Sequence, residues 1–167
     1  ASLRQARTPG IAQINGHCIG GGIVLACACD IRIASTDATF AVPAAKLGLG
    51  YEHENYTALA RLVGHGQATA MVLSARTYDV DTALRTGLIQ EAVAKPDLHS
   101  HVESLALDMA RLAPLTLAAT KASARADGTP DGSTVAQQAI DRCFDSVDFA
   151  EGRLAFREKR RPEFHGR

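Results

Sequence analysis

The sequence has little of what marks several common protein classes. Its 167 residues include no Trp, and aromatic residues make up only 5% of the chain. No run of apolar residues is long enough to cross a membrane. Lys plus Arg and Asp plus Glu both number 18, so the formal net charge is +0. A balanced chain offers no strong field to nucleic acid or to an anionic membrane, and we expect neither as a partner.

Cysteine is also sparse. The chain has four, and Cys18, Cys27 and Cys29 fall in one apolar, glycine-rich region, at spacings unlike a zinc site or a disulfide framework. They are predicted to be buried, reduced thiols of a cytoplasmic protein. No set of His, Cys, Asp and Glu has the spacing of metal ligands, so no metal is expected.

The chain is long enough for one domain with a core of its own, and its apolar pattern predicts an α/β fold. Short apolar runs bounded by turn residues predict strands, followed by a helical tail. The expected strands are 11–14, 31–34, 39–42 and 88–93. The expected helices are 23–29, 56–62, 67–73, 80–85, one from residue 98, 115–125, one capped by Ser133 after a loop from Asp127 to Gly132, and 149–160.

The most informative stretch is the glycine triplet Gly20-Gly21-Gly22, between a short strand and a small-residue helix. Glycine permits unusual backbone angles and close approach of a ligand, and the start of a helix presents unpaired N–H groups. Such an end can bind an anion or polarise a carbonyl oxygen. A close-packed turn without a ligand explains the spacing equally well. The spacing fits neither a dinucleotide fingerprint nor a P-loop.

The pattern N-G-x-x-x-G-G-G followed by seven residues and Asp, from Asn15 to Asp30, resembles the signature of the crotonase family, also called the enoyl-CoA hydratase/isomerase family. The resemblance continues along nearly the whole chain and in the family's order. It is carried by residues 30–34, 40–43, 47–50, 83–89 and 156–160.

The resemblance implies a crotonase-like spiral of ββα units followed by C-terminal helices for oligomerisation. Residues 1–97 would form the C-terminal part of the spiral core, and residues 98–167 a helical tail that assembles a homotrimer or hexamer. The family has a further N-terminal region before this point. The chain therefore resembles the C-terminal two-thirds of the family unit.

The resemblance also implies a substrate, an acyl-CoA thioester, with coenzyme A as part of the substrate and no separate cofactor. Two backbone N–H groups hold the thioester oxygen as it gains enolate charge, an arrangement called an oxyanion hole. By its place in the triplet, Gly21 would supply one of these donors, with Gly20 beside it as a substrate-binding residue. The other donor belongs to the family's N-terminal region.

Both positions that carry the catalytic Glu in the family's hydratases are apolar here, Val24 and Ala44. Neither side chain can move a proton, which favours isomerisation or another enolate reaction over hydration. The resemblance makes Glu52 the candidate base, because some family isomerases carry an acidic residue on that loop; His53 and Glu54 are weaker candidates. A solvated surface loop is the alternative for this segment.

Phe156 and Lys159 are expected to share one helix face, since they are three residues apart. In the family, matching residues reach the CoA of a neighbouring subunit, where the ring stacks on adenine and the ammonium meets a phosphate. A solvated basic helix end is the alternative.

His17 and Asp30 are interpreted as structural residues. A second hypothesis for the whole protein is a non-catalytic or truncated acyl-CoA-binding or assembly subunit.

Overall fold

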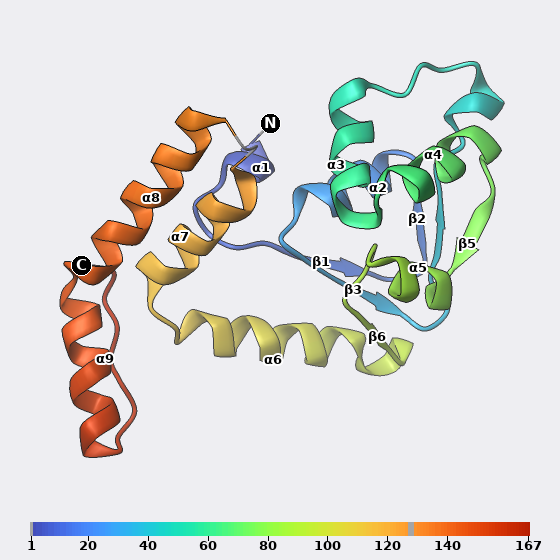
Figure 1. Ribbon diagram of the computed structural model, residues 1–167. Helices are drawn as coiled ribbons and strands as arrows, with labels where there is room; N and C mark the ends of the chain where they lie inside the picture. The colour runs from blue at the N-terminus through green and yellow to red at the C-terminus, as the bar shows by residue number, and fades with distance from the viewer. Residues whose placement is uncertain (1, 127–128) are drawn as a thin grey trace. The chain divides into compact units, whose positions relative to one another are not determined.

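The computed structural model describes residues 2–126 and 129–167 as a mixed α/β fold (Figure 1). The chain divides into two compact units. The first holds residues 10–104 with the first few residues of the chain, and the second holds residues 6–9 and 105–167. None of the helices in the described part of the chain is both long and apolar enough to span a membrane.

The first unit contains two three-stranded sheets. In one sheet the order is β1-β3-β6, and both pairings are parallel. In the other the order is β2-β4-β5, with β2 and β4 parallel and β4 and β5 antiparallel. The strands are β1 (Ile11–Ile14), β2 (His17–Ile19), β3 (Ile31–Ser35), β4 (Thr39–Ala41), β5 (Thr77–Asp79) and β6 (Glu91–Val93).

The helices up to residue 110 are α1 (Ser2–Gln5), α2 (Gly21–Ala28), α3 (His53–Val63), α4 (His65–Ser74), α5 (Val80–Thr86) and α6 (Leu98–Ala110), with 3₁₀ turns η1 (Ala44–Leu47) and η2 (Lys95–Asp97). Helix α6 begins in the first unit and ends in the second. Helix α5 shows clear local signals. The Asp79 side chain accepts the Thr82 N–H at its start, and Gly87, with φ 79°, ends it.

Small and branched apolar side chains fill the core of the first unit. Phe40, Ile23 and Leu59 are completely buried, and alanines from β3, α2 and α4 pack around them. Small residues let helices and strands approach closely, so the core closes without any Trp.

A buried arginine on β3 holds the segment that leads into the neighbouring strand β6. The Arg32 side chain is only 3% exposed, and its Nε donates to the Leu88 carbonyl at 2.8 Å. Its Nη1 donates to the Cys29 carbonyl at 2.9 Å and its Nη2 to Gln90 Oε1 at 3.0 Å. Burial lowers the pKa of this guanidinium, but arginine stays protonated. The charge therefore fixes the segment that leads into β6.

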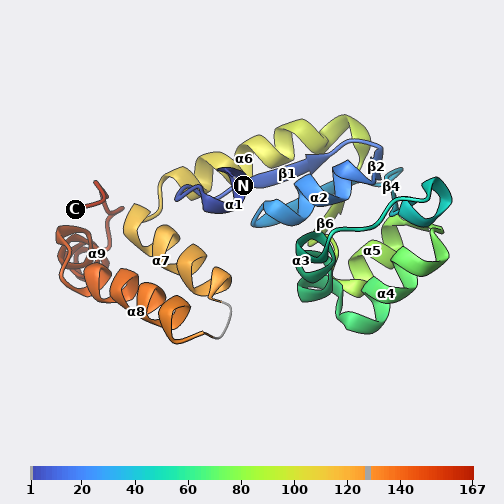
Figure 2. The same cartoon turned by 90° about the horizontal axis from the view of Figure 1, so that it is seen from above.

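The second unit is built of helices α7 (Pro114–Arg125), α8 (Pro130–Phe144) and α9 (Val147–Glu158). Figures 1 and 2 both show α7 and α8 side by side. Two cations on α7 hold the chain's early segment 6–9 in this unit. Lys121 Nζ donates to the Thr8 carbonyl at 2.7 Å, and Arg125 donates to the Ala6 carbonyl at 2.8 Å.

Several local predictions need correction. Strands β2 and β5, each three residues long, were not expected. The expected strand 88–93 is shorter, since Leu88 and Ile89 are buried in the turn before β6. Ser133 is not the N-cap of α8; Thr129 caps it by accepting the Gly132 N–H, so the expected loop ends before Pro130. Residues 127–128 of that loop lie outside the described residues.

Replacing Arg32 by Met should lower the free energy of unfolding by about 2–4 kcal/mol, because it leaves buried acceptors unsatisfied. Urea unfolding followed by circular dichroism measures the change. Lys95→Ala is the matched control: its partner Asp37 is half exposed, so the free energy of unfolding should barely change. Equal effects of the two substitutions would contradict the role given to Arg32.

Candidate functional site

The turn from β2 into α2 depends on Gly20. This residue has φ 54° and ψ −110°, a conformation open essentially to glycine alone. Its N–H donates to the Ala41 carbonyl at 2.9 Å, and its carbonyl accepts the N–H of Ile23 at 3.0 Å. One residue thus ends the strand and starts the helix. Gly21 and Gly22 already lie in α2, so only Gly20 of the triplet needs a positive φ.

The N–H of Gly21 is the best candidate donor of the first unit. Gly21 is exposed at the first position of α2, and no acceptor within the described ranges meets its N–H. A Cβ added to Gly21 would meet nothing within 4 Å, whereas one at Gly22 would lie 3.6 Å from Cys18 Sγ. Gly21 thus has open space at its Cα, and its N–H lies at the positive end of the α2 helix dipole.

Val24 and Ala44, at the positions where the family's hydratases are expected to carry Glu, are apolar. Val24 is half-buried in the first turn of α2. Ala44 opens η1 and packs against the buried core cluster. Neither offers a group that could take up or release a proton.

Glu52 lies directly before α3, whose first turn it joins through its carbonyl. Its carboxylate is exposed and accepts a hydrogen bond from Asn55 Nδ2 at 3.1 Å. His53 and Glu54 are exposed on the same turn. Gly21 and Glu52 thus lie at the N-terminal ends of α2 and α3, two helices that pack against each other in one unit.

The thiols and the two residues interpreted as structural take no evident part in chemistry. Cys18 is buried, and burial together with nearby Cys27 raises its pKa to about 11, which disfavours a reactive thiolate. His17 Nδ1 pairs with Thr39 Oγ1 at 2.7 Å, and Asp30 accepts the Gly10 N–H at 2.6 Å. Among the described residues no group of His, Cys, Asp and Glu is arranged to hold a metal ion.

Phe156 and Lys159 lie in the second unit. Phe156 is on α9 and is 86% exposed. Lys159 follows the helix and has a left-handed backbone, with φ 55°. Helix α9 thus ends one residue before Lys159, whereas the expected helix ran to residue 160. The functional role of the pair remains a prediction.

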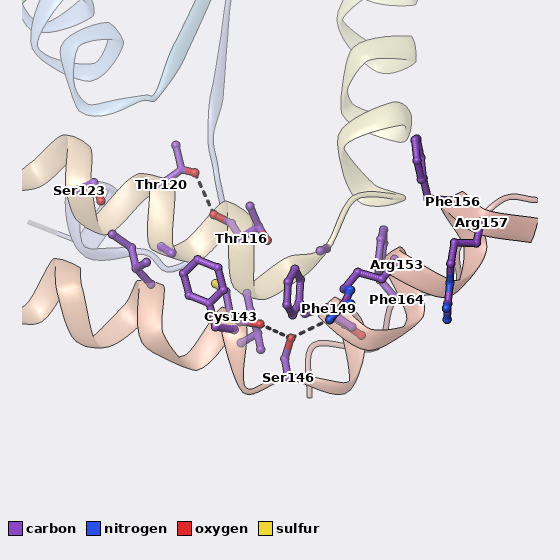
Figure 3. Close-up of a pocket in the computed structure, with 17 residues that line it drawn as sticks. Thr116, Thr120, Ser123, Cys143, Ser146, Phe149, Arg153, Phe156, Arg157 and Phe164 are labelled. Carbon is purple, nitrogen blue, oxygen red and sulfur yellow. Dashed lines mark hydrogen bonds between the residues drawn. The ribbon is translucent and has the colours of Figure 1, made fainter. Parts of the chain in front are cut away.

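Sequence reasoning missed an apolar cavity of about 870 Å³ between α7, α8 and α9 (Figure 3). Its wall is mostly aromatic and aliphatic, and Phe144 meets Phe149 edge to face with ring centroids 5.6 Å apart. A signal was present in the sequence, because the phenylalanines gather after residue 140. The main lining side chains are Leu115, Ile140, Phe144, Phe149, Phe156 and Phe164.

Comparison with known proteins places this architecture in one class, the crotonase fold. An enoyl-CoA hydratase from Bacillus anthracis superposes with a TM-score of 0.91 at 29% identity, over 99% of this chain and 65% of that chain. An enoyl-CoA hydratase/carnithine racemase from Magnetospirillum magneticum gives a TM-score of 0.87 at 32% identity, over 99% of this chain and 62% of that one. The predicted α/β spiral with C-terminal helices is confirmed.

The family model described as enoyl-CoA hydratase/isomerase matches residues 1–167, and the chain belongs to that family. A Mycobacterium tuberculosis protein named "Probable enoyl-CoA hydratase echA6" is 36% identical over 159 residues, or 95% of this chain. The short-chain-enoyl-CoA hydratase of Clostridium acetobutylicum is 34% identical over 164 residues, or 96% of this chain. The chain spans 64% and 63% of these relatives' lengths, respectively.

Proposed function

We propose that the protein binds acyl-CoA thioesters and stabilises the enolate formed from them. The observation that carries the proposal is the N–H of Gly21, exposed at the start of α2 and without an acceptor among the residues described. A fixed donor stabilises charge that develops in the transition state without reorganising at the moment of reaction. Membership of the enoyl-CoA hydratase/isomerase family supports the same substrate class.

The reaction we propose is an isomerisation or another enolate reaction rather than hydration. Adding water across a double bond needs a base for the water and an acid for the carbon. Val24 and Ala44 supply neither. Moving a proton between two carbons of one substrate needs a single base that returns the proton it takes, and Glu52 is our candidate.

The alternative is a non-catalytic subunit that binds acyl-CoA or serves assembly. It is favoured by the surroundings of Glu52, whose exposed carboxylate is bonded to Asn55 in its own helical turn. A solvated carboxylate is a weaker base toward carbon than a desolvated one. Measuring turnover and CoA binding together separates the two functions, because a non-catalytic subunit binds CoA and turns over no substrate.

For the nucleotide end of CoA we propose Phe156 and Lys159. An 86% exposed aromatic ring three residues before a lysine suits a flat, anionic ligand, since adenine stacks on rings and phosphate attracts ammonium. Coenzyme A enters as part of the substrate, and no separate cofactor is proposed.

Gly21→Pro tests the oxyanion donor. Proline is accepted at the first position of a helix and removes the N–H, so the fold should persist while turnover of 3-enoyl-CoA falls about 10²–10³-fold. Gly21→Ala keeps the N–H and is the matched control for bulk at this position. Unchanged turnover in the proline variant of the native protein would overturn the assignment.

Glu52→Gln tests the base. We expect turnover of 3-enoyl-CoA to fall at least about 10²-fold, with CoA affinity measured by calorimetry unchanged, because the amide keeps the shape but cannot take a proton. Glu54→Gln, on the same exposed turn, should leave turnover within about twofold. If the native protein binds CoA and turns over neither crotonyl-CoA nor 3-enoyl-CoA, the non-catalytic alternative holds.

We also propose that the second unit assembles the protein into homotrimers or hexamers through the aromatic cavity of α7, α8 and α9. Phe144 is 63% exposed there, an unfavourable state for a large apolar side chain. Phe144→Asp should lower the mass measured by light scattering to that of one chain. Val135→Asp is the control: Val135 is 60% exposed on the same helix but does not line the cavity. A monomeric native protein would refute the assembly.

A further inference from the structure

Helix α2 carries the proposed donor at its first residue, and its other end lacks the features that usually complete a helix. Cys29, which follows the last helical residue, has an extended backbone with φ −87° and ψ 161°, and the last turn contains no basic side chain. Helices commonly end on a left-handed glycine or place a cation near their last, unpaired carbonyls. For α2 the cation comes from the strand that follows it.

Arg32 on β3 supplies this cation. Its Nη1 donates to the Cys29 carbonyl, at the negative end of the α2 dipole. The same guanidinium donates to the Leu88 carbonyl and to Gln90 Oε1, which also accepts the Arg32 backbone N–H at 2.9 Å. Three acceptors around one planar group leave the side chain little freedom to turn. The end of α2 is therefore bonded to the segment that leads into β6.

Asp30 makes a second link at the turn between α2 and β3. Its carboxylate accepts the Gly10 N–H at 2.6 Å, and the N–H groups of Asp30 and Ile31 donate to the Gly10 carbonyl at 2.9 and 3.2 Å. Asp30 is exposed, whereas Arg32 is only 3% exposed. Water replaces an exposed partner more readily than a buried one. Arg32 is therefore the side chain whose loss would release the end of α2.

The two ends of α2 are coupled because the helix is short. It has eight residues, from Gly21 to Ala28, and its hydrogen-bonded turns move together as one body. Gly20 fixes its start through the turn from β2, and Arg32 fixes its end. A displacement of about 1 Å far from the reacting atoms can lower a rate by about 10²-fold. Release of the far end would therefore be felt at the Gly21 N–H.

We propose that Arg32 is a positioning residue, which holds the end of α2 through the Cys29 carbonyl and so orients the Gly21 N–H toward the oxygen of a bound thioester. The inference rests on the proposed function of Gly21 as the oxyanion donor. A solely structural arginine would change the free energy of unfolding and leave the turnover of the folded protein unaltered.

The test is a double-substitution cycle in the turnover of 3-enoyl-CoA, at a temperature where circular dichroism shows every variant folded. Arg32→Met should lower kcat about tenfold and leave CoA affinity within about twofold. In the Gly21→Pro background the same change should cost no further turnover, because the donor through which it acts is gone. Leu98→Ala is the control: it removes a buried side chain of α6, which also lowers stability, and should keep kcat within about twofold.

A second readout needs no turnover. The infrared stretch of an isotope-labelled thioester carbonyl in bound butyryl-CoA should lie below that of the free compound, because a hydrogen-bond donor polarises the carbonyl. Arg32→Met should move the stretch back toward the free value, and Leu98→Ala should leave it unchanged.

The outcomes separate the inference from the function beneath it. If Gly21→Pro keeps both the turnover and the carbonyl stretch, the proposed role of Gly21 fails and the inference fails with it. If Gly21→Pro loses both and Arg32→Met keeps both, the inference alone is refuted. Equal losses of kcat in Arg32→Met and Leu98→Ala, or additive losses in the double variant, would show that Arg32 acts only through the fold.

Arg32→Lys keeps the inference testable where Arg32→Met does not fold. Lysine retains the buried charge, but its single nitrogen cannot reach all three acceptors in the geometry of the guanidinium. We expect kcat to fall at least about threefold, again with CoA affinity retained. Native turnover and a native carbonyl stretch in this variant would refute positioning through the hydrogen bonds of Arg32.

Discussion

The backbone of Gly20 is the constraint on which the first unit depends. Its N–H extends the hydrogen bonding between β2 and β4, and its carbonyl receives the first amides of α2. The chain turns this sharply because φ is positive, which glycine adopts without strain; space is not the constraint, since an added Cβ would lie 4.0 Å from Pro43 Cδ. The next amide, Gly21, is then left at the helix start with no protein acceptor in the described chain. The candidate donor is thus a direct product of the turn geometry.

The large aromatic side chains are distributed unevenly between the two units. Helix α2 packs against β2, where Gly22 lies near Cys18, and alanines fill the surrounding core. Of the five phenylalanines, only Phe40 is buried in that core, and the other four line the cavity of the second unit. Small side chains suit a core that the strands and helices of the first unit enclose by themselves. Exposed rings suit a surface that gains stability when something covers it.

The sequence predicts best those features that a single local pattern determines. Strand β1 and the end of α5 at Gly87 carry such patterns, namely a bounded apolar run and a left-handed glycine. Strands β2 and β5 carry none, and both pair with β4, which lies between them in the second sheet. The left-handed Lys159 was beyond local prediction as well. In a sequence, glycine is the residue that usually indicates such a turn. Here Arg160 and Glu151 stabilise the turn instead, and their pairing leaves no periodic pattern in the sequence.

The candidate site separates into a backbone part and a side-chain part, and the two respond differently to substitution. The Gly21 amide belongs to the main chain, so no change at Val24 or Ala44 removes it while α2 still begins where it does. Proton transfer, in contrast, depends wholly on side chains and disappears with them. Under the proposed function, a chain without the two hydratase carboxylates would still polarise a thioester through its main chain. Polarisation lowers the barrier to losing a neighbouring proton whichever base accepts it, so the proposed backbone donor would set the class of reaction and the nearby side chains would select among its members.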